Sequence, residues 1–192
     1  PTRRSSDLAG FIAIGSYSGA ILGKMMNGLP GLFAGMAVGV VISVIVAFLV
    51  GLPTLRLKGD YLAIATLGVA EIIRVAVTNM KITNGAAGIS GVPLTNTWTI
   101  TYIALVLTTI LILNYTFSSA GRATYAVLQD EIAAESMGVQ VTKYKILAFV
   151  LGAATASIGG TLSATTLGAV TPSDFTFMKS IEVLIIVVFG GI

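Results

Sequence analysis

Val40–Val50 reads VVISVIVAFLV, an apolar run that decides the fold class of this chain. An α-helix satisfies its own backbone N–H and C=O groups, so it can cross hydrocarbon with apolar side chains on every face. A membrane-spanning β-strand would instead alternate apolar and polar residues over about 10 positions. Because the run is continuous rather than alternating, it favours a helix. We therefore expect an all-α fold, a polytopic bundle of transmembrane helices.

The composition extends this expectation to the rest of the chain. Hydrophobic residues make up 55% of the sequence and charged residues only 10%, whereas a soluble domain carries about 25% charged residues. The mean hydropathy is +0.95, and the 22 glycines suit closely packed membrane helices. The sequence has no Cys and no His, which excludes thiol chemistry and removes the usual metal ligand. A net charge of +3 is too small to predict nucleic-acid binding.

Several apolar segments are long enough to span a bilayer, which needs about 20 residues. Complete spans are expected at Leu29–Leu52, Tyr61–Met80, Trp98–Phe117 and Ile146–Val170. Two shorter segments, Leu8–Leu22 and Ile181–Ile192, are interpreted as truncated spans. The sequence thus predicts about four complete spans plus two truncated ones.

Both ends of the sequence are interpreted as cut. Residues 1–8, PTRRSSDL, are polar and directly precede apolar sequence. The same octapeptide is encoded by one reading frame of a common sequencing-adapter oligonucleotide, so we interpret it as a scar outside the fold. A short cytoplasmic arm is the alternative. At the other end the chain stops inside an apolar run, so residues 9–192 are expected to be one transmembrane domain of a longer protein.

Loop charges predict the orientation of the spans. One set of loop cations is Arg56, Lys58, Arg122, Lys143 and Lys145, and the other set is Lys24, Lys81 and Lys179. Cytoplasmic loops carry the excess of Lys and Arg, so the first set is expected inside. Trp98 and Tyr102 would then lie near the outer interface, where amphipathic rings are favoured.

The most informative polar segment lies between the third and fourth expected spans. Gly121–Lys145 reads GRATYAVLQDEIAAESMGVQVTKYK. Good helix formers after an acidic start predict a short amphipathic helix over 131–138, lying on the membrane surface. Ala133 and Ala134 would let another surface approach closely, and Gly138 can end the helix in a left-handed conformation. An ordinary solvated connector is the alternative.

The second expected span contains two charges. Glu71 and Arg74 lie three residues apart, on one face of a helix. Each charge would cost about 2.5–3.5 kcal/mol at the centre of an isolated spanning helix. We therefore expect them to be turned away from lipid, inside the bundle, paired with each other, or near the outer interface. They are interpreted either as a polar element of a pathway or, preferentially, as a structural ion pair.

A glycine-rich segment, TNGAAGISGVP at 83–93, follows the second span. Its three glycines and its proline exclude a regular helix. It also does not contain the G-x-x-x-x-G-K-[ST] string of a phosphate-binding P-loop. We expect a compact loop on the outer face. It is interpreted as a tight turn or as a contact for a docking protein or a pathway entrance.

The fourth expected span carries a face of small residues. One row recurs at every fourth position, namely Gly152, Ala156, Gly160, Ala164 and Gly168, and Ala153, Ser157, Thr161, Thr165 and Ala169 form the adjoining row. Small residues let helix backbones approach closely. Gly15–Gly19 and Gly35–Gly39 are weaker examples of the same pattern. We expect a closely packed seam, and the alternative is a seam that also slides or separates in function.

These motifs resemble a known family. Ala133, Ala134 and Gly138 match the E-A-A, three residues, G pattern of the EAA loop in ABC-importer permeases, although Ile132 stands where the acidic residue is expected and Glu131 lies one position earlier. GDYLAIATLGVAEIIR, NGAAGISGVP, DEIAAESMG and TPSDFTFMKSIEVLIIVVFGG occur in order along residues 9–192. Together they resemble the LivM-type inner-membrane permease of branched-chain amino acid ABC importers.

The resemblance implies a bacterial, multi-pass permease subunit of the plasma (inner) membrane that moves branched-chain or related amino acids. It implies a second permease subunit, two cytoplasmic ATP-binding subunits and an extracytoplasmic substrate-binding protein. ATP and Mg would be used by those partner subunits, with no cofactor, metal or catalytic residue in this chain, which is therefore not expected to be an enzyme. The residues assigned to the ATPase-coupling loop are Asp130, Glu131, Ala133, Ala134, Glu135 and Gly138.

Other functions stay open at the level of sequence. A permease for urea or short amides of the same family is one alternative. An ion-coupled secondary transporter would need its own coupling-ion site, to which only Glu71, Arg74 and Glu182 could contribute. A membrane enzyme would need a cluster of acid, base or nucleophile, which the lack of His and Cys disfavours.

Overall fold

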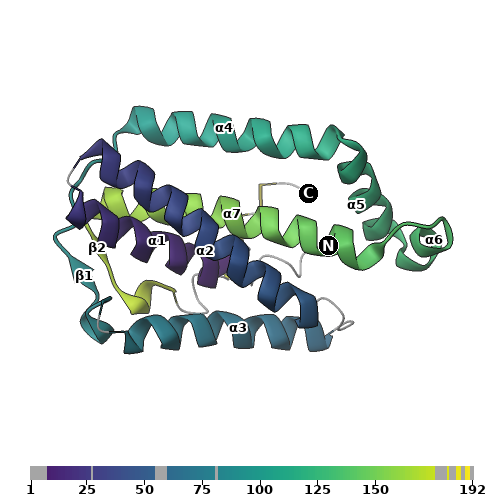
Figure 1. The fold of residues 1–192 in the computed structure, drawn as a ribbon, viewed down its shortest axis with the longest axis horizontal. Coiled ribbons are helices and arrows are strands. Elements are labelled where there is room, and N and C mark those ends of the chain that lie inside the picture. The colour runs from purple at the N-terminus through teal and green to yellow at the C-terminus, as the bar shows by residue number, and fades with distance from the viewer. Residues whose placement is uncertain are drawn as a thin grey trace.

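The computed structural model describes residues 8–26, 28–54, 60–80, 82–175, 181, 185–186 and 189–190. Within these residues the chain is helical with one very small sheet, so the predicted all-α class is confirmed (Figure 1). Several sequence predictions fall outside the described residues. They concern the scar at residues 1–7, the loop cations Arg56, Lys58, Lys81 and Lys179, and Glu182.

Seven α-helices account for most of the described chain. They are α1 (Leu8–Met25), α2 (Leu29–Thr54), α3 (Asp60–Asn79), α4 (Trp98–Phe117), α5 (Ser119–Gln129), α6 (Glu131–Ser136) and α7 (Val141–Leu167). The shorter elements are the 3₁₀ turns η2 (Gly85–Ala87) and η3 (Pro172–Phe175) and the strands β1 (Ile89–Ser90) and β2 (Ala169–Val170).

Three of the described helices, α2, α4 and α7, are long and apolar enough to span a membrane. The predicted number of about four complete and two truncated spans is therefore not confirmed. Helix α2 begins at the predicted Leu29, and α4 has both predicted ends. Helix α1 was predicted to end at Leu22 but continues to Met25, which gives it 18 residues and a length of about 27 Å.

The predicted bounds of the fourth span, Ile146–Val170, were wrong at both ends. Helix α7 begins at Val141 rather than Ile146, because Lys143 and Lys145 can lie in its first turns outside the apolar layer. It ends at Leu167, since Gly168 has a φ of 74° and provides the left-handed C-cap. Gly168 is therefore not part of the helical small-residue face to which the sequence pattern assigned it.

The centre of the bundle is the packing of α1 against α7, with α2 against both, while α3 and α4 lie on opposite sides (Figure 1). The backbones of α1 and α7 touch. A Cβ added at Gly15 would lie 2.0 Å from the Ser157 carbonyl oxygen, and one added at Gly160 would lie 2.2 Å from the Ile12 carbonyl oxygen. Only glycine fits at these two positions.

Two hydroxyls hydrogen-bond across this contact in opposite directions. Ser16 Oγ donates to the Gly160 carbonyl at 2.9 Å, and Thr161 Oγ1 donates to the Gly15 carbonyl at 2.9 Å. Both hydroxyl residues are buried. In a bilayer such a bond contributes about 0.6 kcal/mol to stability. The value is modest because the polar groups of separated helices also find hydrogen-bond partners within the membrane.

Helix α2 reaches the same contact through its own glycine pair. A Cβ at Gly35 would lie 2.8 Å from Gly19 Cα, and one at Gly39 would lie 2.4 Å from Ser18 Oγ and 2.9 Å from Ser157 Oγ. The small residues of α7 thus lie in a three-helix junction rather than in a two-helix seam. The junction also buries the adjoining row of α7, in which Ala153, Ser157, Thr161 and Thr165 are each fully covered.

The glycine-rich segment closes one end of the bundle. Strands β1 and β2 pair antiparallel, with Ile89 opposite Val170 and Ser90 opposite Ala169. Ile89 and Val170 are buried in one apolar cluster with residues of α1 and α7. Lys24 Nζ donates to the Ser90 carbonyl at 2.9 Å, so the end of α1 is tied to β1. Helices α5 and α6 lie at the opposite end of the bundle (Figure 1).

We predict that Gly160→Ala destabilises the bundle by about 1–3 kcal/mol, because its Cβ would force α1 and α7 apart. Gly159→Ala is the matched control, since a Cβ there meets nothing within 4 Å. Unfolding of both variants in detergent micelles measures the difference. Equal stability of the two variants would show that the α1–α7 contact adapts without cost.

Candidate coupling site

The chain turns sharply between α4 and α5 as it leaves the predicted span. Ser118 caps α5, its hydroxyl accepting a hydrogen bond from the Gly121 N–H at 3.2 Å. A Cβ at Gly121 would lie 2.2 Å from the Tyr115 carbonyl oxygen, so this turn also needs a glycine. As a result α5 leads away from α4 toward the start of α7 at one end of the bundle (Figure 1).

A short helix forms where the sequence predicts one. Asp130 is its N-cap, and its Oδ1 accepts from the Ile132 N–H at 2.9 Å and the Ala133 N–H at 3.2 Å. The helix ends at Ser136 rather than at Gly138, because Gly138 has a φ of 81° and turns the chain back toward α7. The cap and the left-handed glycine thus define the two ends of a unit built on the six-residue helix α6.

The two alanines of α6 face different ways. Ala133 is exposed, but Ala134 is only 5% exposed and its carbonyl accepts from the Val139 N–H at 3.0 Å. The expectation that both alanines present a surface to another protein is therefore wrong for Ala134, which packs within this chain. The exposed apolar side chains of the unit are instead Ile132, 76% exposed, and Met137, 84% exposed.

An ion pair joins α6 to α7. Glu131, the first residue of α6, pairs with Lys145 in the second turn of α7. The Lys145 side chain is only 13% exposed, while that of Glu131 is 43% exposed. The sequence identified Glu131 as a displaced acidic residue and Lys145 as a loop cation, but nothing in their spacing indicated that they meet.

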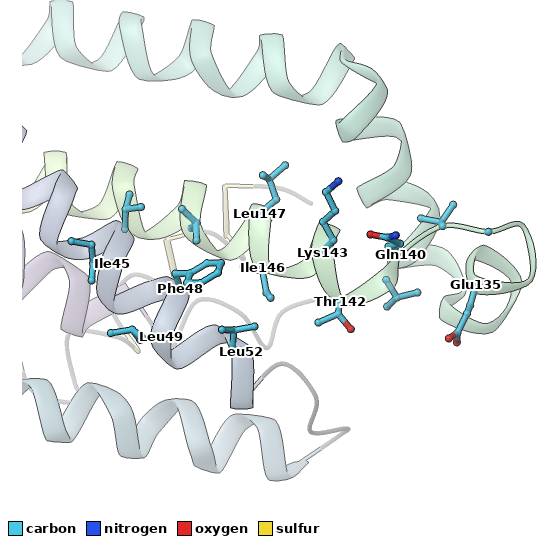
Figure 2. Close-up of a pocket in the computed structure, with 15 residues that line it drawn as sticks. Ile45, Phe48, Leu49, Leu52, Glu135, Gln140, Thr142, Lys143, Ile146 and Leu147 are labelled. Carbon is cyan, nitrogen blue, oxygen red and sulfur yellow. The ribbon is translucent and has the colours of Figure 1, made fainter.

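A groove of about 1120 Å³ runs from this unit along the bundle (Figure 2). One wall comes from α2, including Ile45, Phe48 and Leu49, and the other from α7, including Ile146 and Leu147. Its polar lining residues lie at the α6 end, and they are Glu135, Gln140, Thr142 and Lys143. The groove is therefore apolar along the spanning helices and polar where α7 begins.

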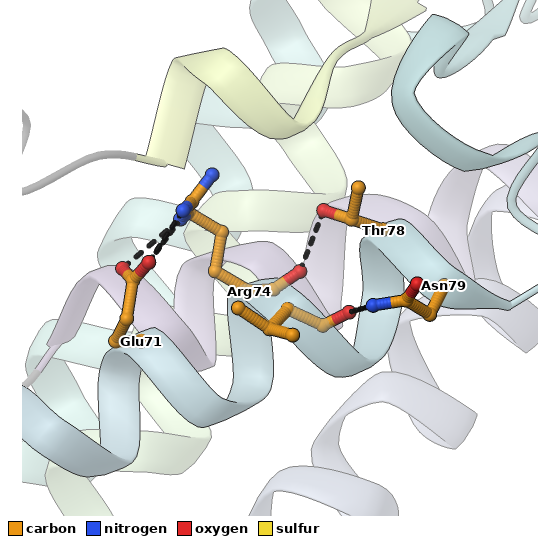
Figure 3. Close-up of polar contacts among 5 residues, drawn as sticks. Glu71, Arg74, Thr78 and Asn79 are labelled. Atoms are coloured by element: carbon orange, nitrogen blue, oxygen red, sulfur yellow. Dashed lines mark hydrogen bonds and ion pairs between the residues drawn. The ribbon is translucent and has the colours of Figure 1, made fainter.

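Glu71 and Arg74 pair with each other, one of the arrangements expected from sequence (Figure 3). Arg74 Nε donates to both carboxylate oxygens, at 3.1 and 3.0 Å. The pair lies on an exposed face of α3 rather than in the core of the described chain. Its orientation relative to lipid stays a prediction. One turn later the Thr78 hydroxyl has a partner within the same helix, since its Oγ1 donates to the Arg74 carbonyl at 2.8 Å.

Sequence reasoning missed the polar contacts of the opposite end. Asn96, in the loop before α4, donates from Nδ2 to Thr166 Oγ1 at 2.7 Å and to the Leu162 carbonyl at 3.2 Å. These bonds tie α4 to the end of α7. An Asn between two Thr residues is typical of a loop, so no sequence signal identified this contact. Among the described residues no group of three or more His, Cys, Asp or Glu could hold a metal ion.

Comparison with known proteins assigns the family. The family model for the permease component of branched-chain amino acid transport systems matches residues 8–192. The chain belongs to this family. It is 36% identical to the high-affinity branched-chain amino acid transport system permease protein LivM of Salmonella typhimurium, over 95% of this chain and 51% of that protein.

Other relatives agree with this assignment. LivM of Escherichia coli K12 is also 36% identical over 95% of the chain. The permease protein LivH of Salmonella typhimurium is 33% identical over 50% of the chain. The chain spans about half the length of the LivM relatives that it matches. No solved structure matches it.

The predicted resemblance to LivM-type permeases is therefore confirmed. Membership of a permease family and three membrane-length apolar helices also confirm the predicted localisation as a multi-pass protein of the plasma (inner) membrane. The family marks the chain as a transport component rather than a catalytic one.

We predict that Asp130→Ala loosens α6, because the N–H groups of Ile132 and Ala133 lose their acceptor, at a cost of about 0.5–2 kcal/mol. Hydrogen exchange of these two amides should become faster. Asp130→Asn is the control, since its side-chain oxygen can still cap the helix. Unchanged exchange in the alanine variant would show that α6 is held by its packing alone.

Proposed function

We propose that this chain is the transmembrane permease subunit of an ABC importer that moves branched-chain or related amino acids, driven by ATP hydrolysed on partner subunits. The family and the LivM relatives support the substrate class. They do not favour a permease for urea or short amides, or an ion-coupled transporter. The single observation that carries the coupling mechanism is α6, a capped helix that presents apolar side chains at the expected cytoplasmic end.

The exposure of α6 fits a docking role. Ile132 and Met137 are large apolar side chains in a segment expected to face water. Complete burial of such a side chain contributes about 1.5–3 kcal/mol, so a partner that covers both gains substantial affinity. We infer that this surface enters a groove on an ATP-binding subunit. In this proposal Asp130 and Gly138 set the two ends of the unit, and Ala133 permits close approach of the partner. Glu135 lines the groove of this chain itself, the one drawn in Figure 2.

The other partners follow from the same assignment. A second permease subunit is supported by the similarity to both LivM and LivH, and two cytoplasmic ATP-binding subunits would bind the ATP and Mg. An extracytoplasmic substrate-binding protein would approach the end of the bundle closed by β1 and β2. Helix α4 has no buried residue of its own, so its apolar surface suits contact with the lipid bilayer.

We predict that Ala133→Trp blocks docking of α6 without disturbing the chain's own packing, since Ala133 is exposed. Transport and substrate-stimulated ATP hydrolysis should fall about tenfold if docking weakens by ~1.4 kcal/mol. The measurement is transport by the complete reconstituted importer. The affinity of the external binding protein for its amino acid should not change.

Thr109→Trp is the control, because it adds the same side chain at an exposed position in the middle of α4, away from both ends of the bundle. Ala134→Trp would be uninformative, since it would disrupt the packing of α6 itself. Normal transport by an assembled Ala133→Trp importer would remove α6 from the coupling mechanism and leave it a connector.

We further predict that the two ends of the bundle lie on opposite sides of the membrane. The sequence has no Cys, so single cysteines at Lys24 and Lys143 can be labelled selectively in an importer whose other cysteines are replaced. In intact cells a membrane-impermeant thiol reagent should label Lys24→Cys, and Lys143→Cys only after permeabilisation. The reverse pattern would invert the orientation expected from the loop charges.

A further inference from the structure

We propose that the Glu131–Lys145 ion pair fixes α6 to α7, so that the two helices move as one body when an ATP-binding subunit displaces α6. This inference rests on the proposed function, because it assigns a positioning role to two residues behind the docking surface. Glu131 does not form part of the exposed apolar surface. It joins that surface to the longest helix of the described chain.

The need for such a connection follows from the way α6 is attached. The helix has six residues, and at each end the backbone departs from helical geometry. Asp130 is extended before it, with φ −153° and ψ 112°, and Gly138 is left-handed after it. A Cβ at Gly138 would meet nothing within 4 Å, so this turn is open. With only these attachments, a push on α6 would rotate it about its two ends.

Two contacts oppose that rotation, one at each end of α6. At its C-terminal end the Val139 N–H donates to the Ala134 carbonyl at 3.0 Å. At its N-terminal end Glu131 is held by Lys145, across the turn and on the second turn of α7. Removing the ion pair removes the side-chain connection from the N-terminal end of α6 to α7.

The pair is placed where its electrostatic attraction is stronger than at an open surface. Lys145 is largely covered, so its charge is less screened by water than that of a fully exposed lysine. Lys143, two residues earlier on the same helix, is exposed, and it forms no ion pair within the part of the chain that the structure describes. The ion pair of Lys145 thus distinguishes it from the neighbouring lysine, and Lys145→Arg, which keeps the charge in place, is the matched control.

Helix α7 carries the displacement to the centre of the bundle. Ser157, where α7 touches α1, lies 12 residues after Lys145 on the same uninterrupted helix. The distance along the helix is about 18 Å. Because Gly15 of α1 and Gly39 of α2 both lie against Ser157, a movement of the start of α7 would change the three-helix junction directly.

The test uses the complete importer in proteoliposomes and measures amino acid transported per ATP hydrolysed. Glu131→Lys and Lys145→Glu should each lower this ratio about fivefold, a typical coupling effect, while the exchanged pair in one chain restores it. Lys145→Arg, which keeps the positive charge at the same position, should keep the ratio. Normal coupling in both single variants, or no recovery in the exchanged pair, would overturn the proposal.

A reversible crosslink separates coupling from folding in a single preparation. An importer with cysteines at both positions, joined by a short bis-thiosulfonate reagent, should couple normally, and reduction of the crosslink should lower the ratio about fivefold. Coupling that is unaffected by reduction would overturn the proposal.

The Ala133→Trp variant distinguishes this outcome from failure of the proposed function. If that variant loses coupling while the ion-pair variants keep it, α6 docks but the ion pair is not the connection. Loss of coupling in Glu131→Lys alone, with no recovery on exchange, would indicate that Glu131 contacts the ATP-binding subunit and would also overturn the proposal.

Discussion

Direct contact between the backbones of α1 and α7 is the constraint on which the rest of the structure depends. Lipid is as apolar as the helix surfaces, so no hydrophobic effect drives spanning helices together, and association relies on close packing and hydrogen bonds. Gly15 and Gly160 remove the side chains that would separate the two helices. The Ser16 and Thr161 hydroxyls then reach carbonyl groups on the opposite helix. Helix α2 and the small sheet take their places against this pair.

Not every buried polar group in this junction has a hydrogen-bond partner. The hydroxyls of Ser43 and Ser157 are buried without a hydrogen-bond partner among the described residues, which costs free energy in a site with little access to water. Ser157 of α7 lies beside Gly39 of α2, and Ser43 lies on α2 one turn after Gly39. The most closely packed part of the bundle thus combines strong contacts with unpaired polar groups.

Sequence predicted the elements well where one local rule decided them. The continuous apolar runs gave α2 and α4, the acidic start and Gly138 gave α6, and the small residues marked the packing of α7. It failed where the outcome depends on a distant residue. Ala133 and Ala134 are the same residue type, and only the packing of α6 on the neighbouring helices α5 and α7 makes one of them buried. The partner of Glu131 lies 14 residues away across a turn, beyond any helical periodicity.

The error at the start of α7 has a physical meaning for coupling. Charges at Lys143 and Lys145 placed these residues in a loop, because a polar run between apolar segments reads as a connector. In the structure they lie in the first two turns of the spanning helix. The helix therefore begins about 7.5 Å before Ile146. A flexible connector would absorb a displacement, whereas a continuous helix transmits it. The segment that lines the polar end of the groove and the segment that packs on α1 are therefore parts of one continuous helix.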